Sequence, residues 1–169
     1  MNMKHLPLIG VLLLSACSPT APAPAKDVAA APAAVDVAAT QAEVRTFIET
    51  YNGYYGANDL DRYFASFDPG LTQWWPSGRV DLATYEKSWR EGVAKGYGTA
   101  KAVVSDLQIQ VGPSGDTAVA TYLLEVTPRV PAGKTATVER NQETDVLFKQ
   151  AGQWKIVHVN YGPAAPPKK

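Results

Sequence analysis

The chain has 169 residues, with 16 Lys and Arg against 16 Asp and Glu, so its formal net charge is zero. This balance argues against a nucleic-acid partner, because binding phosphates requires a concentrated basic surface. The only cysteine is Cys17, which excludes an intramolecular disulfide and leaves the folded part to be stabilised by its core alone.

The first residues resemble the signal peptide of a bacterial lipoprotein. An apolar run starts at Leu6 behind Lys4, and it closes on the sequence LSAC at residues 14–17, which resembles a lipobox. The run is too short for a bilayer span, which needs about 20 residues. The resemblance implies removal of residues 1–16, lipid on Cys17 and anchoring to a cell-envelope membrane on its periplasmic or other extracytoplasmic side. The alternative is a core helix that begins at Leu6.

Residues 17–40 are predicted to be the lipidated cysteine and a Pro/Ala-rich tether. After Cys17 this stretch has prolines and many alanines but no aromatic residue, so it cannot bury enough surface to fold. It serves either as a spacer from the membrane or as an unselected leader. The folded domain is expected at residues 41–162, and residues 163–169 are expected to be a disordered tail.

Helices are predicted in the first part of the domain. Apolar residues recur at helical spacing over residues 42–55, and a second, short helix follows from Asn58 or Asp59. Residues 71–75 form a candidate strand. Asp81 is the expected N-cap of a third helix.

After Gly98 the apolar period changes from 3.6 to 2, which predicts strands. Four are expected, at residues 103–111, 118–126, 138–149 and 154–161. Helices followed by antiparallel strands predict an α+β domain in which a curved sheet wraps the helices.

The order of these elements, and above all the stretch ETDVLFKQAGQWKIVHVNYGP, resembles the nuclear-transport-factor-2-like (NTF2-like) superfamily. The similarity is to its polyketide-cyclase-like and kinase-association-domain-like branches. Its most specific part is a strand, a turn at Gly152 and the Trp-x-Ile-Val-His pattern that begins at Trp154. The resemblance implies an α+β cone with three N-terminal helices packed in a strongly curved antiparallel sheet. It also implies a pocket at the open end of the cone and a homodimer formed through the sheet.

The chain departs from these relatives at three positions. Asn160 stands where many of them have a second histidine, and Asp145 and Tyr161 stand where some kinase-associated relatives have arginines. The missing arginines argue against an anionic ligand that they would clamp.

The last hairpin predicts one pair of residues with acid–base chemistry. Counting outward from a two-residue turn at 151–152 places Asp145 opposite His158, with Cβ atoms about 5 Å apart. An aspartate that orients a histidine suits general-base catalysis. The alternative is a structural cross-strand pair, and a β-bulge near Asn160 would re-aim both side chains.

Other chemistry has little support in the sequence. Glu125 and Glu143 are further acidic candidates, but both are expected to face solvent. The only other histidine, His5, lies in the signal peptide, so no metal site is expected. Without a phosphate-binding loop or a nucleophile-elbow serine, no cofactor and no acyl transfer is expected.

Aromatic residues predict a pocket for an apolar or planar molecule, although on the helices they could also be core. Since adjacent strand residues face opposite sides, only one of Trp74 and Trp75 can enter the interior. The predicted pocket residues are Tyr51, Tyr55, Trp74, Trp75, Tyr85, Trp89, Tyr122, Asn160 and Tyr161.

Three functions remain open at this point. The first is a lipid-anchored, non-catalytic domain that binds a small apolar ligand or a peptide in the cone. The second is an isomerase, dehydratase or cyclase that uses Asp145 and His158. The third is a structural dimerisation module for another envelope protein.

Overall fold

The computed structural model describes residues 34–165, so the predicted signal peptide, Cys17 and most of the tether lie outside it, as do residues 166–169. The first helix, α1, spans Val37–Ala57. It begins where the Asp36 side chain accepts a hydrogen bond from the Ala39 backbone N–H at 3.0 Å, as an N-cap does. The predicted tether is therefore wrong for residues 37–40, where alanines without a proline continue the helix.

Asn58 ends α1 in the left-handed conformation, with φ of 56°. Its side chain donates to the Thr99 carbonyl at 2.7 Å and accepts from the Thr99 N–H at 2.8 Å, which ties the end of α1 to the sheet. Asp59 then caps α2 (Leu60–Ala65) by accepting from the Arg62 N–H at 3.2 Å. A side chain at Gly98 would not fit, because its Cβ would lie 2.2 Å from Asn58 Oδ1.

The first strand, β1 (Phe67–Trp75), starts earlier than predicted and contains Pro69. Its pairing with the last strand shifts register between Phe67 and Thr72, and an irregular stretch of this kind tolerates a residue without an N–H. A two-residue strand, β2 (Gly78–Arg79), follows. Asp81 then caps α3 (Leu82–Ala94) by accepting from the Thr84 N–H at 2.8 Å, which confirms the predicted start of this helix.

Six strands form one curved sheet in the order β2-β1-β6-β5-β4-β3. The four long strands are antiparallel neighbours: β3 (Gly98–Val111), β4 (Thr117–Arg129), β5 (Glu139–Gln150) and β6 (Gln153–Pro163). The predicted all-antiparallel sheet is wrong at one place, because β6 enters between β5 and β1 and pairs with β1 in parallel. Register shifts in β3, β6 and β1 bend the sheet.

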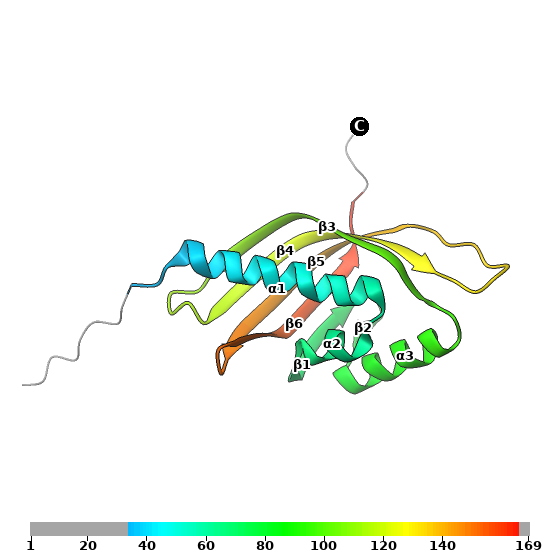
Figure 1. Ribbon diagram of the computed structural model, residues 1–169, viewed down its shortest axis with the longest axis horizontal. Helices are drawn as coiled ribbons and strands as arrows, with labels where there is room; N and C mark the ends of the chain where they lie inside the picture. The colour runs from blue at the N-terminus through cyan, green and yellow to red at the C-terminus, as the bar shows by residue number, and fades with distance from the viewer. Residues whose placement is uncertain (1–33, 166–169) are drawn as a thin grey trace, which may run out of the picture. The chain divides into compact units, whose positions relative to one another are not determined.

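The three helices of the described residues lie on the same face of the sheet, which we call the inner face (Figure 1). Apolar side chains without solvent exposure fill part of the space between the helices and the inner face of the sheet. This packed cluster consists of Val44, Ile48, Leu147 and Ile156, each 0% exposed.

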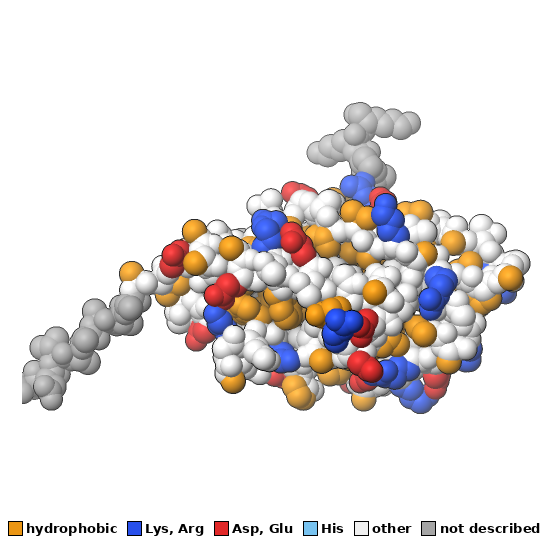
Figure 2. Space-filling model, viewed as in Figure 1, with side chains coloured by type: hydrophobic (Ala, Val, Ile, Leu, Met, Phe, Trp, Pro, Cys, Tyr) orange, Lys and Arg blue, Asp and Glu red, His pale blue; other side chains and the backbone are white. Residues whose placement is uncertain are grey.

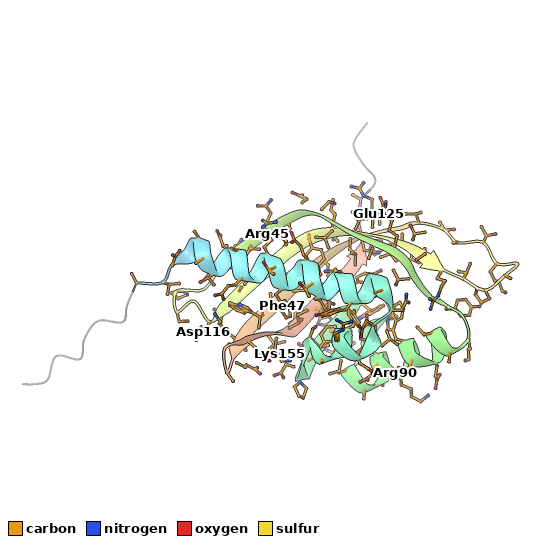
Figure 3. All side chains as sticks on the ribbon, viewed as in Figure 1. Arg45, Phe47, Arg90, Asp116, Glu125 and Lys155 are labelled. Atoms are coloured by element: carbon orange, nitrogen blue, oxygen red, sulfur yellow. The ribbon has the colours of Figure 1, made fainter. Side chains whose placement is uncertain are left out.

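Charged side chains of both signs are scattered over the helix-bearing side of the domain (Figure 2). Arg45, on the side of α1 that faces β3, donates to the Leu107 carbonyl at 3.4 Å (Figure 3). Arg90 on α3 reaches Asp61 of α2 at 2.9 Å. Among residues 34–165, no helix is long and apolar enough to cross a membrane.

Candidate functional site

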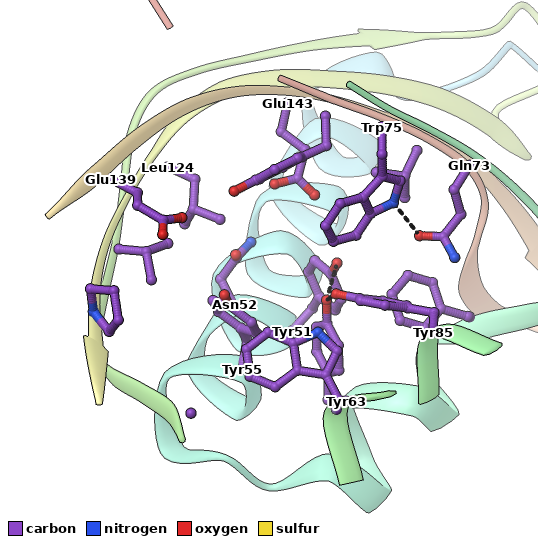
Figure 4. A pocket seen from close by; sticks show the side chains of 17 residues that line it. Tyr51, Asn52, Tyr55, Tyr63, Gln73, Trp75, Tyr85, Leu124, Glu139 and Glu143 are labelled. Atoms are coloured by element: carbon purple, nitrogen blue, oxygen red, sulfur yellow. Dashed lines mark hydrogen bonds between the residues drawn. The ribbon is translucent and has the colours of Figure 1, made fainter. Parts of the chain in front are cut away.

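A cavity of about 190 Å³ lies between the helices and the inner face of the sheet. Aromatic side chains from every helix and from β1 and β6 line much of the cavity (Figure 4). These are Tyr51, Tyr55, Tyr63, Phe67, Trp75, Tyr85, Trp89 and Tyr161. The described residues that line it include Glu139 and Glu143 but no lysine, arginine or histidine.

Two acidic residues of β5 point inward from neighbouring positions on one face of the strand. Asp145 is 0% exposed and Glu143 is 6% exposed. Strand residues two apart share a face, and Leu147 of the packed cluster continues the same row. The Glu143 carboxyl points from the sheet into the cavity (Figure 4). Asp145 is fully buried and is not among the residues that line the cavity.

Asp145 is held by a short chain of hydrogen bonds. The Tyr122 hydroxyl donates to Asp145 Oδ2 at 2.8 Å, and Asn52 Nδ2 lies 3.4 Å from that hydroxyl oxygen. Asn52 Nδ2 also donates to the Ile48 carbonyl at 3.0 Å. Asp145 Oδ1 has no hydrogen-bond partner among the described residues. An ionised carboxylate there would be poorly stabilised, which favours the protonated acid.

Burial also raises the proton affinity of both carboxyls. Loss of solvation raises the pKa of Asp145 to about 7, although the hydrogen bond from Tyr122 opposes this effect. Burial, followed by the charge of Asp145, raises the pKa of Glu143 well above its ordinary value. Because each negative charge disfavours the other, the pair keeps a proton near neutral pH when the cavity contains no cation.

Three tyrosine hydroxyls on the helix side of the cavity satisfy one another. Tyr63 lies 3.2 Å from Tyr51 and 2.7 Å from Tyr85, oxygen to oxygen. Burial raises the pKa of all three phenols well above 10, so they remain neutral. Two hydrogen bonds thus join the three hydroxyls, which leaves one of their three O–H donors outside this chain.

The two tryptophans of the wall also present ring surface. The Trp75 indole N–H donates to Gln73 Oε1 at 3.1 Å, and its ring centroid lies 5.0 Å from that of Tyr161. Trp89 packs edge to face with Tyr55, with centroids 5.1 Å apart. In the described interior, Gln73 Nε2 is a buried donor without a partner. The wall therefore offers aromatic rings, carboxyl oxygens and several donors, among them the hydroxyls of Tyr55 and Tyr161.

The predicted contact between Asp145 and His158 is wrong. The turn forms as expected, with Gln150 opposite Gln153 and Leu147 opposite Ile156. A bulge at Val157 then shifts the register by one residue, so that Asp145 lies opposite Val159. His158 instead lies opposite Val146, and its Nδ1 is 2.7 Å from Thr72 Oγ1. One extra residue in a strand turns the following side chains to the other face.

Of the nine predicted pocket residues, six line the cavity: Tyr51, Tyr55, Trp75, Tyr85, Trp89 and Tyr161. The other three do not. Trp74 faces outward, 46% exposed, with the Arg79 guanidinium 4.8 Å from its ring centroid. Asn160 is exposed, and Tyr122 lies in the interior beside Asp145.

The prediction that Glu143 faces solvent is also wrong. Its position two residues from Asp145 and four from the apolar Leu147 was the available signal, because strand residues at even spacing share a face. Asn52, Gln73 and Tyr63 gave no comparable pattern. Glu125 is exposed, as expected. No group of three acidic, histidine or cysteine side chains within residues 34–165 is placed to hold a metal ion.

The profile of the SnoaL-like domain family matches residues 44–166, and the chain belongs to this family. No curated protein matches the sequence. Solved structures show that the fold is NTF2-like, an α+β arrangement with a curved mixed sheet.

Three solved structures illustrate the range of this fold. A candidate scytalone dehydratase from Novosphingobium aromaticivorans has a TM-score of 0.67 and 18% identity, over 76% of this chain and 86% of that one. An NTF2-like protein from Cytophaga hutchinsonii has a TM-score of 0.64 and 17% identity, over 73% and 98%. A candidate Ca/calmodulin-dependent kinase II association domain from Exiguobacterium sibiricum has a TM-score of 0.63 and 13% identity, over 76% and 96%. The same fold thus occurs in a candidate enzyme and in an association domain.

Proposed function

We propose that this protein is a lipid-anchored cell-envelope protein whose domain binds a small, largely apolar molecule. The observation behind this proposal is the cavity of about 190 Å³, walled by aromatic rings, with the Glu143 carboxyl at its surface. Pockets of this character, mostly apolar with a few placed polar groups, are typical of small-molecule sites. The volume suits a molecule smaller than a typical drug and does not suit a peptide.

The anchor is part of the same proposal and rests on the sequence LSAC at residues 14–17. Labelling cells with a radioactive fatty acid should mark the wild-type protein and not the Cys17→Ala variant. The variant should also leave the membrane fraction. Equal labelling of both proteins would contradict the anchor and would leave the cavity unaffected.

Binding can be tested with the four tryptophans of the chain as internal reporters. Trp75 and Trp89 line the cavity, whereas Trp74 and Trp154 do not. We expect a panel of small neutral aromatic and alicyclic molecules to shift the indole N–H resonances of Trp75 and Trp89 in the full-length Cys17→Ala chain. The resonances of Trp74 and Trp154 should stay in place.

A matched pair of variants locates the binding site. Trp89→Leu removes a wall residue and should weaken binding of any hit, while Trp74→Leu, on the outer face, should leave binding unchanged. If no probe, neutral or charged, moves the Trp75 and Trp89 resonances, the proposed function is wrong.

A second candidate function is an acid–base enzyme of the isomerase, dehydratase or cyclase type. The specific observation is Glu143, a carboxyl with a raised pKa at the surface of a cavity. If Glu143 transfers protons, the protein should catalyse deuterium uptake from D₂O next to the carbonyl of a small ketone. Glu143→Gln should abolish this exchange, and Glu125→Gln, which changes an exposed carboxyl, should not. Exchange that persists in Glu143→Gln would exclude this role.

A further inference from the structure

The charge of the cavity wall is the starting point for an inference about the ligand. Glu139 and Glu143 line the cavity and the buried Asp145 follows on the same strand, whereas no basic residue is among the described lining residues. An anionic ligand would meet two carboxyls and no basic side chain among the described lining residues. A neutral apolar ligand would fill the space but would leave the Glu143 carboxyl without a partner in a desolvated site.

The hydrogen-bonding groups of the cavity wall also favour a cationic ligand. The hydroxyls of Tyr51, Tyr63 and Tyr85 are bonded to one another, and the Trp75 N–H is bonded to Gln73. The wall still offers the carboxyl oxygens of Glu139 and Glu143, and its remaining donors include the hydroxyls of Tyr55 and Tyr161 and the buried Nε2 of Gln73. The carboxyls favour a positively charged group on the ligand, and the donors accommodate a hydroxyl or ether oxygen.

Aromatic rings are the second feature of the cavity, besides its carboxyls, that suits a cation. Trp75 lies 5.0 Å from Tyr161 and 5.2 Å from Tyr85, centroid to centroid, and Tyr55 lies 5.1 Å from Trp89. Tryptophan and tyrosine faces attract cations within about 6 Å, more strongly when water is excluded. The three pairs are contacts between rings, tilted for Trp75 and Tyr161 and edge to face for the other two, and these rings line the cavity together with Glu143. An ammonium group in the cavity would therefore lie beside both aromatic rings and a carboxyl.

We propose that the cavity binds a small organic ammonium ion, with the charged nitrogen over the faces of Trp75 and Tyr161 and the Glu143 carboxylate as its counter-ion. This inference rests on the proposed function and names the chemical class of its ligand. An apolar skeleton contacts Leu124 and Val126, and an oxygen on it accepts from Gln73.

Binding of a cation must displace a proton from the acidic pair. The titratable groups around Glu143 come from every neighbouring element: Tyr51 and Tyr55 of α1, Tyr63 of α2, Tyr85 of α3, Tyr122 of β4, Tyr161 of β6, and Glu139 and Asp145 of its own strand. The phenols stay neutral because burial raises their pKa values, so the proton that a cation displaces comes from Glu143 and Asp145. Affinity should rise with pH, by up to about tenfold per pH unit while the pair is still protonated.

The test compares each cation with a neutral molecule of nearly the same shape. We would titrate the full-length Cys17→Ala chain with choline against 3,3-dimethylbutan-1-ol, and with 2-phenylethylamine against 2-phenylethanol, by calorimetry at pH 6 and pH 8. At least one cation should bind about tenfold or more tightly than its neutral partner. Titration in buffers of different ionisation enthalpy should show net proton release for the cation only.

Variants assign the effect to Glu143. Glu143→Gln should lower the affinity for the cation about tenfold or more and leave the neutral partner within about twofold, whereas Glu125→Gln should change neither. Trp75→Leu, which keeps the carboxyl, should also weaken cation binding, so the assignment does not depend on one variant folding.

The outcomes separate this inference from the proposed function. If the neutral molecules bind as tightly as the cations, or if only neutral probes of the panel bind, the ammonium inference is wrong and small-molecule binding stands. If no cation and no neutral probe binds, both are wrong. Tighter cation binding that is unchanged in Glu143→Gln would also overturn the assignment.

Discussion

The interior between the sheet and the helices has two unlike halves. The packed cluster of Val44, Ile48, Leu147 and Ile156 is apolar and without solvent exposure. The other half contains the cavity and its two inward-facing carboxyls. β5 passes through both, since Leu147 belongs to the first and Asp145 and Glu143 to the second. The same layered architecture thus contains a tightly packed apolar region and, beside it, a cavity that carries the ligand chemistry.

The largest effect on stability is expected in the packed cluster. Ile48→Ala should lower the free energy of unfolding by about 2–5 kcal/mol, because it removes buried methyl groups and leaves a void that neighbours fill only in part. Urea unfolding measures this loss. A loss below about 1 kcal/mol would show that the two halves are not packed differently.

The cavity half should make stability depend on pH. The pKa of Asp145 is about 7 in the folded protein and about 3.9 in an unfolded chain, so the folded state binds its proton more tightly. The stabilising contribution of this proton is fully present below about pH 4 and is lost as pH rises through 7, a difference of about 4 kcal/mol at most. The raised pKa of Glu143 likewise makes the folded state less stable as pH rises.

Asp145→Asn should flatten this dependence. Urea unfolding at pH 5 and pH 8 should show a smaller difference in the variant than in the wild type. Exposed carboxyls whose pKa values are lowered, such as Asp81, make stability rise with pH instead. They do so equally in the wild type and in the variant. Identical pH dependence in the two proteins would mean that Asp145 stays ionised.

A smaller effect is expected from the tyrosine wall. Tyr85→Phe removes one hydroxyl from the chain of three, and the Tyr63 hydroxyl keeps its contact with Tyr51 at 3.2 Å. The loss should be about 1 kcal/mol. Thermal or urea unfolding provides the measurement, and a loss as large as that of Ile48→Ala would show that the hydroxyl network supports the fold as much as the packed cluster does.

Glu143→Gln should have the smallest effect on stability of these four. It removes a carboxyl whose ionisation is unfavourable in place, so stability at pH 8 should remain unchanged or rise slightly. The same variant should lose cation binding. Strong destabilisation would instead make Glu143 a structural residue of the interior.

Much of the domain was predictable from local patterns. The helical stripe of α1, the N-cap at Asp81 and the turn at Ala151 and Gly152 depend on neighbouring residues only, and all three form as expected. Trp75 and Tyr85 reach the cavity for a similarly simple reason, since their elements must bury aromatic surface. The parallel pairing of β1 with β6 was not predictable, because it joins segments from opposite ends of the domain.

By itself the sequence determined the balanced charge, the single cysteine, the family and the alternation that sorts β5 into an inner and an outer face. Only the tertiary structure decided which inner residues meet. The bulge at Val157 separates His158 from Asp145, and the curved sheet brings Trp75 and Tyr161 to the same cavity as Glu143. The physical reason is that periodicity assigns a side chain to a face, whereas a bulge and the packing of distant strands set its neighbours.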